Sequence, residues 1–191
     1  MISDKPTAAE ASEIKALEST WPRNLIAEGL AEPLARLWVQ SRSRALAEGH
    51  PAFARHAMND AIAEGLFHAR RARRLVRGLE GAEASLESQE VDLKKVEAAR
   101  AGGSSVRVSR LLIVSRDGSS RFFRQVEKIQ ARFANRLAVL VLECDEEALG
   151  AAAFGPGKQA RAMLLDHKDA VIRFLGLLDL PAVDDVTGTS E

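Results

Sequence analysis

The chain has 191 residues, and its 27 lysine and arginine residues balance 27 aspartate and glutamate residues, so the formal net charge at pH 7 is +0. This balance excludes a strong overall attraction to nucleic acid or anionic membranes, and an electrostatic partner must be recognised by local clusters. The single cysteine, Cys144, excludes an intramolecular disulfide, and the lack of long apolar runs or a leader pattern predicts a cytoplasmic protein that neither spans a membrane nor is secreted.

The N-terminal third of the chain is predicted to be helical. Residues 1–20 are rich in small and charged side chains and are expected to be a flexible segment. Leucines then keep helical spacing up to a break at Pro33, which a helix tolerates only in its first turn. A Gly-His-Pro turn at residues 49–51 separates this segment from a second helix predicted over residues 53–78. We therefore expect a helical extension over residues 21–65 that docks as a helical hairpin on the rest of the chain.

Five arginines are concentrated near the predicted end of the second helix. They are Arg70, Arg71, Arg73, Arg74 and Arg77. At about 100° per residue, all of them except Arg71 fall within an arc of about 100°, so four guanidinium groups share one helix face. Like charges at this spacing repel by about a few tenths of a kcal/mol, and phosphate suits the two-pronged arginine donor. Alternatively, carboxylates such as Glu64, Glu80 and Glu83 neutralise this face, or it is simply solvated.

The stretch from residue 106 to residue 178 alternates short apolar runs with amphipathic segments. The runs at residues 111–114, 137–142 and 162–165 have no polar alternation, which is typical of parallel strands covered on both faces. Residues 137–142 are the best candidate for the central strand. The pattern predicts an α/β domain over residues 66–180, with helices on both faces of a short, mostly parallel sheet and thus three α/β/α layers.

Helices are expected after each of these strands. The first has apolar residues such as Val126 and Ile129 on one face. Asp145 and Asp166 are predicted to cap the second and third helices by accepting hydrogen bonds from backbone N–H groups of the first turn. Residues 181–191 have the composition of a disordered tail.

Several short segments of this part resemble one protein family. Residues 67–86 have the sequence FHARRARRLVRGLEGAEASL, which resembles the first helix, short first strand and second helix of the kink-turn-binding ribosomal protein family of the L-seven-Ae type. Residues 111–119 are similar to its second strand and acidic turn, residues 146–152 to its Glu-Leu-Gly helix start, and residues 162–165 to the strand that follows. The resemblance covers residues 66–178 in pattern and implies an α/β fold that binds structured RNA.

The resemblance does not extend to the side chains that read RNA in that family. There, a glycine and one variable residue precede Asn-Glu, with a lysine three residues further on. Here the glycine is Gly78, and the other positions hold Glu80, Gly81 and Ala84. The resemblance also implies RNA contacts in the loop before the last strand, where Lys158 lies beside flexible glycines.

A second departure is the segment at residues 87–110, which is longer than the simple turn of the family. Leu93 and Val96 lie at helical spacing, and Gly and Ser residues at 102–105 resemble a flexible joint. We expect an insertion here. It is either an additional helix, or residues 91–101 are themselves the second helix of the family.

Other chemical signals are weak. Residues 150–158 resemble a phosphate loop, but the lysine does not directly follow the second glycine and no Ser or Thr comes after it. The turn at residues 115–120 lies where a strand precedes a helix and could hold an anion, or Asp117 and Ser119 bond locally. The histidines have no metal-ligand spacing with Cys144. We therefore predict no metal, no cofactor and no catalytic set.

Three functions remain. The first is a non-enzymatic RNA-binding or ribosome-associated protein that contacts structured RNA through the arginine face and a second basic patch. The second is a protein-interaction or scaffold module without a nucleic-acid role, in which Trp21, Trp38 and the leucines form a homodimer or a partner groove. The third is an enzyme that uses the turn at residues 115–120. The candidate phosphate-binding residues are Arg70, Arg71, Arg73, Arg74, Arg77, Arg116, Arg121 and Lys158.

Overall fold

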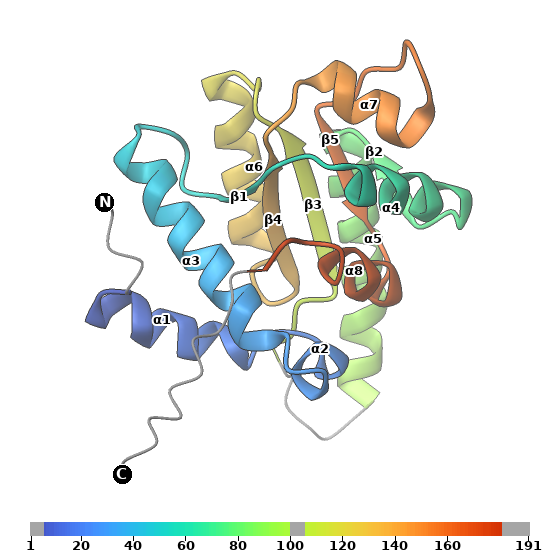
Figure 1. Ribbon diagram of the computed structural model, residues 1–191. Helices are drawn as coiled ribbons and strands as arrows, with labels where there is room; N and C mark the ends of the chain where they lie inside the picture. The colour runs from blue at the N-terminus through green and yellow to red at the C-terminus, as the bar shows by residue number, and fades with distance from the viewer. Residues whose placement is uncertain (1–5, 100–105, 181–191) are drawn as a thin grey trace.

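Five strands form one sheet at the centre of the computed structural model, which describes residues 6–99 and 106–180 (Figure 1). Their order across the sheet is β1-β4-β3-β5-β2. The strands are β1 Ala54–His56, β2 Leu75–Arg77, β3 Arg110–Ser115, β4 Leu137–Leu142 and β5 Ala162–Leu165. The helices of the described ranges are α1 Ala8–Glu18, α2 Arg23–Ala27, α3 Ala31–Ala47, α4 Asp60–Arg71, α5 Leu79–Ala99, α6 Ser120–Arg132, α7 Glu146–Phe154 and α8 Lys168–Leu175.

The sheet is mostly parallel, as predicted. Strands β1 and β3 both pair in parallel with β4, whereas β5 runs antiparallel between β3 and β2. The central strand is β3 and not β4, which corrects the prediction. Both strands are almost entirely buried, so uniform apolarity does not distinguish the middle of the sheet from the position beside it.

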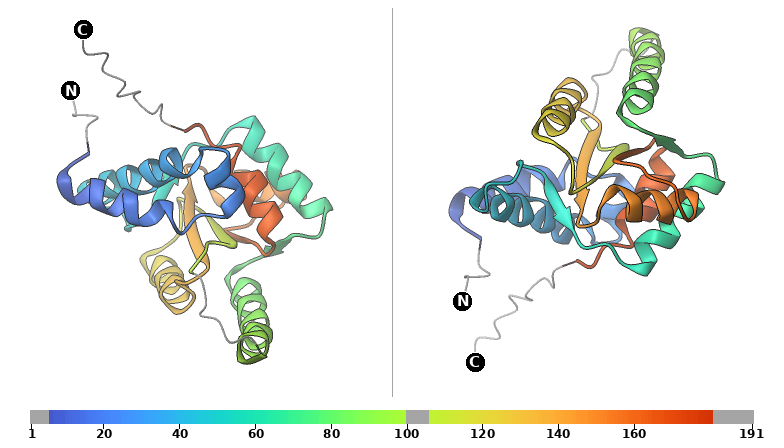
Figure 2. Two further views of the ribbon diagram at one scale, coloured as in Figure 1. Left: turned by 90° about the horizontal axis from the view of Figure 1, so that it is seen from below. Right: turned by 90° about the horizontal axis from the view of Figure 1, so that it is seen from above.

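The sheet is covered by helices on both faces, which confirms the three-layer α/β/α architecture. Alternate residues of each strand point to opposite faces, so Leu111 and Ile113 of β3 face one core while Leu112 and Val114 face the other. The first core is covered by α2, α3, α4, α7 and α8, and the second by α5 and α6. Figure 2 shows α5 and α6 alone on their side of the sheet.

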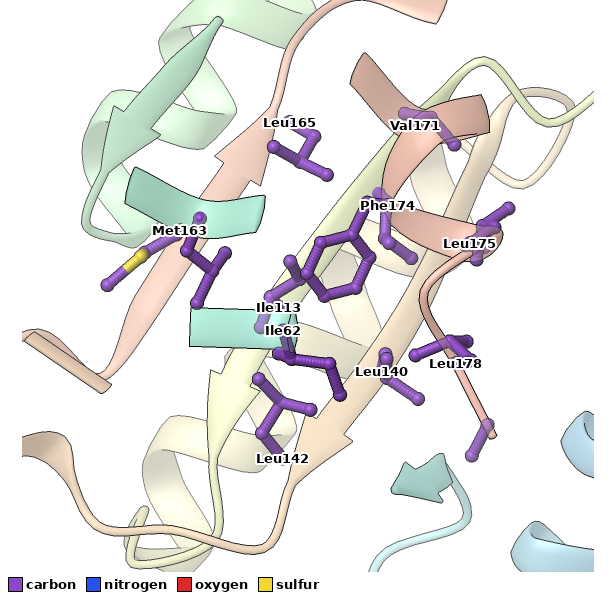
Figure 3. Close-up of a cluster of buried hydrophobic side chains, with 14 of the residues drawn as sticks. Ile62, Ile113, Leu140, Leu142, Met163, Leu165, Val171, Phe174, Leu175 and Leu178 are labelled. Carbon is purple, nitrogen blue, oxygen red and sulfur yellow. The ribbon is translucent and has the colours of Figure 1, made fainter. Parts of the chain in front are cut away.

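Helix α8 packs on the first core. Figure 3 shows Phe174 of α8 among the side chains of Ile62 from α4, Ile113 from β3 and Leu140 from β4. Phe174 is 2% exposed, and the other three are completely buried. Helix α8 therefore holds α4 and the middle strands in a single apolar cluster.

The N-terminal segment differs from the flexible stretch expected over residues 1–20. Within the described part of it, α1 begins with a capping box, in which Thr7 and Glu10 satisfy each other's backbone N–H groups. Ile14 is buried against Ala35 and Val39 of α3, so α1 is held by packing. Residues 1–5 lie outside the described residues.

The break at Pro33 is confirmed, because Pro33 lies in the first turn of α3. The second helix over residues 53–78 is wrong, since this stretch forms β1, α4 and β2. Phe53 packs on the core covered by α5 and α6, whereas Ile62 packs on the opposite core. Apolar residues that are at helical spacing in the sequence therefore pack on opposite faces of the sheet. The boundary expected at residue 65, between the helical extension and the α/β domain, lies inside α4.

Helix α5 runs without interruption to Ala99. The segment from residue 87 onwards is therefore a continuation of the helix that starts at Leu79 and is not a separate inserted helix. The expected joint at residues 102–105 and the expected tail at residues 181–191 lie outside the described residues.

Asp145 caps α7 as predicted, because its carboxylate accepts a hydrogen bond of 2.8 Å from the backbone N–H of Ala148. Asp166 does not cap α8. The cap is His167, whose Nδ1 accepts from the backbone N–H of Asp169 at 3.3 Å. No helix in the described ranges is long and apolar enough to cross a bilayer.

Candidate functional site

The four arginines predicted to share a helix face, Arg70, Arg73, Arg74 and Arg77, do not share one, which corrects the prediction. Helix α4 ends at Arg71, and Arg73 adopts a left-handed conformation with φ of 55°. The chain turns there and continues into β2, whose last residue is Arg77. The side chains of these four arginines and of Arg71 are nevertheless exposed, so all five surround the end of α4 on the surface.

Two of these arginines meet over one aromatic ring. The guanidinium carbons of Arg70 and Arg77 lie 5.4 and 5.2 Å from the ring centroid of Phe154, the last residue of α7. Arg77 also donates a hydrogen bond to the backbone carbonyl of Gln159. A guanidinium group over a ring face is attracted by the ring quadrupole, so the ring holds both groups at the surface.

Lys158 belongs to the same surface, because it precedes Gln159 in the loop between α7 and β5. Gly155 and Gly157 have φ of 94° and 74°, a left-handed backbone that favours glycine. The loop lies directly on α7, since a Cβ added to Gly150 would be 2.1 Å from the carbonyl oxygen of Lys158. We call the following residues the basic surface: Arg70, Arg71, Arg73, Arg74, Arg77 and Lys158.

The basic surface is not neutralised by the carboxylates that were considered from the sequence. Glu64 contacts His68 at 3.3 Å, and Glu83 contacts Arg132 at 3.5 Å. Within residues 6–99 and 106–180, no ion pair joins a carboxylate to any residue of the basic surface. Its six cations are therefore available to an external anion.

A shallow hollow of about 330 Å³ borders the basic surface at the start of α5. It is lined by Arg77, Gly78 and Glu80 on one side and by Arg161 before β5 on the other. The backbone N–H of Gly78 donates to the carbonyl of Ala162 at 2.8 Å. The glycine turn before α5 and the loop before β5 therefore lie side by side.

Arg116 and Arg121 are not part of the basic surface as defined. Arg116 follows β3 and Arg121 is in the first turn of α6, and both are exposed. Arg116 lines a different hollow, together with Arg55 and Arg124. Phe122 and Gln125, which follow Arg121 in α6, line the hollow beside Arg77.

The turn between β3 and α6 is closed by its own hydrogen bonds, as the local-bonding alternative predicted. Asp117 accepts from the hydroxyl of Ser115 at 2.6 Å and from the backbone N–H of Glu146 at 3.2 Å. Ser119 accepts from the N–H of Phe122 at 3.2 Å. Burial would raise the pKa of Asp117, but these hydrogen bonds and the charge of Arg161 lower it overall.

Cys144 lies at the end of β4 and is 8% exposed. Burial, helped by the charges of Asp145 and Asp117, raises the pKa of its thiol to about 11. In the part of the chain that the structure describes, no group of three or more His, Cys, Asp or Glu side chains is arranged to hold a metal ion. Cys144 therefore has the surroundings of a structural thiol.

We expect iodoacetamide to alkylate Cys144 much more slowly in the folded protein than in urea. The reactive species is the thiolate, and a pKa near 11 in place of 9.0 lowers its fraction at pH 8 by about a hundredfold. Mass spectrometry of timed samples gives both rates. Equal rates in the folded and unfolded protein would contradict the buried position of this thiol.

Trp21 and Trp38 are mostly buried, and both also line a hollow of about 360 Å³ beside α6. They are 1% and 8% exposed, and their rings meet edge to face at 5.0 Å within the first core. The leucines Leu25 and Leu34 pack in the same cluster. The apolar side of the N-terminal helices is therefore used to cover the sheet.

Two features near the arginines have no clear signal in the sequence. The first is Phe154, whose role depends on how α4 packs beside α7 and has no local signal except its position before Gly-Pro-Gly. The second is a groove of about 720 Å³ between α4 and α8, with Arg74, His68, His167 and Arg173 among its lining residues. Its small side chains, such as Ala69, were indistinguishable from ordinary helix formers.

Comparisons with known proteins do not assign a family. No protein-family model and no curated protein matches the chain. A solved structure described as a protein with unknown function from Bacillus halodurans C is similar over 64% of this chain and 99% of its own, with 18% sequence identity and a TM-score of 0.38. At this level the similarity carries no argument about fold or function.

Proposed function

We propose that the protein binds structured RNA, as a non-enzymatic or ribosome-associated factor, through the basic surface around the end of α4. The observation that carries the proposal is that six exposed cations lie there without an ion pair among the described residues. Phosphate oxygens are the natural partners of such groups, because guanidinium forks donate two parallel hydrogen bonds to them.

The ring of Phe154 strengthens this case. Long cationic side chains lose conformational freedom when they bind. Arg70 and Arg77 are already restrained over the ring, and Arg77 is also bonded to Gln159. Part of the conformational entropy that these side chains would lose on binding phosphate is therefore already lost in the free protein.

Structured RNA is favoured over unpaired strands. Reading unpaired bases requires exposed aromatic side chains on which bases stack. The chain contains no tyrosine, Phe154 is covered by Arg70 and Arg77, and Phe67, which is 40% exposed, has the guanidinium group of Arg71 over its ring. Contacts to the phosphates of a folded RNA need only cations, and the sequence resemblance to the kink-turn-binding family points to the same class of partner.

The charge-reversal pair Arg70→Glu and Arg77→Glu is expected to weaken binding of a bulged RNA hairpin by about tenfold or more. The slope of log K against log salt should also become shallower by about 1.4 to 1.8, because each of the two lost phosphate contacts contributes about 0.7 to 0.9. Fluorescence anisotropy across a salt series measures both values.

The matched control is the pair Arg23→Glu and Arg44→Glu, which changes the net charge equally. Both arginines are exposed, on α2 and α3, away from the end of α4 (Figure 1). This control should keep most of the affinity. Equal losses in the two pairs, or no binding by the unmodified protein at low salt, would remove the proposal.

A further inference from the structure

A second group of arginines lines a hollow at the opposite edge of the sheet. The hollow has a volume of about 500 Å³, and its arginines come from three elements: Arg55 from β1, Arg116 from the loop after β3, and Arg124 from α6. Arg55 is far in the sequence from Arg116 and Arg124, so its convergence with them is a product of the fold.

The sheet topology explains the convergence. Strands β1 and β3 flank β4 and run parallel to it, so their carboxyl ends meet at one edge, which is where open α/β sheets bind ligands. Arg116 is the first residue after β3, and its backbone N–H donates to the carbonyl of Cys144 at 2.9 Å. Ser120 and Arg124 follow on successive turns of α6 and line the same hollow.

The arginines of the hollow differ in how they are held. Arg55 is fixed by an ion pair of 2.6 Å with Glu143, and its backbone N–H donates to the hydroxyl of Ser41 at 3.0 Å. Arg116 and Arg124 are exposed and form no ion pair within the described ranges. The hollow thus has one anchored cation and two that are free to bind.

The charge of the lining fits one oxyanion. Glu143 offsets Arg55, and Glu127 on the rim offsets part of the charge of Arg116 and Arg124. The start of α6 adds the partial positive charge of a helix N-terminus. The remaining positive charge matches a single phosphate group and does not match a longer polyanion.

The shape of the lining favours a phosphate ester over a carboxylate. The two free guanidinium groups, Arg116 and Arg124, come from different elements and can each contact a different oxygen of a tetrahedral group, whereas a carboxylate presents two oxygens in one plane. The volume falls within the range of small-molecule sites, about 300 to 1,000 Å³. Leu46, Pro51 and Phe123 provide apolar wall for the rest of a ligand.

We propose that this hollow binds the phosphate group of a small phosphorylated molecule, at a site separate from the basic surface. Arg55 and Arg77 lie on the two edge strands of the five-stranded sheet, which are about 19 Å apart at the usual strand spacing. The proposal does not depend on RNA binding, and a failure of one leaves the other standing.

Isothermal titration with inorganic phosphate, and with acetate at the same ionic strength, tests the site on the full chain. We expect phosphate to bind and acetate to bind at least about tenfold more weakly. The pair Arg116→Gln and Arg124→Gln should weaken phosphate binding by about tenfold or more. The pair Arg23→Gln and Arg173→Gln, on α2 and α8, removes two exposed arginines that do not line the hollow and should leave phosphate affinity unchanged. Equal phosphate affinity in both pairs, or equal affinity for acetate and phosphate, would overturn the proposal.

A second variant separates loss of the site from loss of the fold. Ser120→Asp places a carboxylate in the first turn of α6, where negative charge is favourable to the helix, and also in the hollow. It should keep or raise the melting temperature and abolish phosphate binding. Retained phosphate binding in this variant would contradict the site.

RNA binding by the pair Arg116→Gln and Arg124→Gln distinguishes a free phosphate ester from the phosphates of RNA. An affinity for RNA close to that of the unmodified protein supports a separate small-molecule site. A loss as large as that of Arg70→Glu with Arg77→Glu would overturn it, because the hollow would then belong to the path of the RNA.

Discussion

Replacing Phe174 with alanine is expected to lower the free energy of unfolding by about 3 to 5 kcal/mol, the usual cost of removing a buried aromatic ring. The ring is 2% exposed and packs with residues of α4, β3 and β4 (Figure 3). Its removal takes away apolar burial and leaves a cavity that three separate elements would have to close together.

This loss is a large fraction of the stability of an ordinary domain, about 5 to 15 kcal/mol. Urea unfolding followed by circular dichroism measures it. The control is Leu46→Ala, because Leu46 is 55% exposed and its truncation should change stability by about 0.5 kcal/mol or less. Similar midpoints for the two variants would contradict the placement of α8 over the sheet.

Gly150→Ala is expected to destabilise the protein although alanine is the better helix former. The intrinsic preference of a helix for alanine over glycine is worth about 1 kcal/mol. Against it, a Cβ at this position would lie 2.1 Å from the carbonyl oxygen of Lys158 and 2.6 Å from the backbone of Gln159. The backbone cannot rotate away as a side chain can. We therefore expect the cost of overpacking to exceed the gain in helix propensity and to lower the free energy of unfolding by about 1 to 3 kcal/mol.

The same substitution should move the loop that carries Lys158 and the carbonyl to which Arg77 is bonded. We therefore expect weaker RNA binding together with a lower melting temperature. The control is Gly176→Ala, whose added Cβ would meet its nearest neighbour, the carbonyl oxygen of Arg173, at an ordinary 3.5 Å. A melting temperature that rises in Gly150→Ala would show that the loop does not lie on α7.

The C-terminal part of the fold was predictable because its strands are uninterrupted apolar runs. Strands β3, β4 and β5 are nearly or fully buried on both faces, and the turns between them carry recognisable caps such as Ser119 and Asp145. No part of the pattern gives strand direction, so the reversal of β5 was not foreseen.

Hydrophobic periodicity did not predict the edge strands, because each has only three residues, although the family resemblance placed a short strand between two helices over residues 67–86, where β2 lies. A three-residue strand has too little alternation to distinguish it from helix. These short strands are defined by their pairing with neighbouring strands and not by their local sequence. Ala54 pairs with Leu140, and Leu75 pairs with Leu165. Arg55 was consequently placed in a helix, and its approach to Arg116 stayed hidden.

The clustering of the arginines could be predicted from the sequence, but their arrangement on the surface could not. Clustered arginines are visible in composition. Their position depends on the left-handed turn at Arg73 and on the packing of Phe154, which are products of tertiary structure. Helical periodicity alone therefore placed these arginines on one helix face, which the structure does not have.

The edge strands β1 and β2 are far in the sequence from β4 and β5, the strands with which they pair, and this affects folding during biosynthesis. While the chain is being made, β1, α4 and β2 leave the ribosome well before β4 and β5, with which the edge strands pair. The apolar face of α4 has no sheet to cover during that interval. The nascent first half therefore cannot complete its own core, and native structure awaits emergence of the last third of the polypeptide.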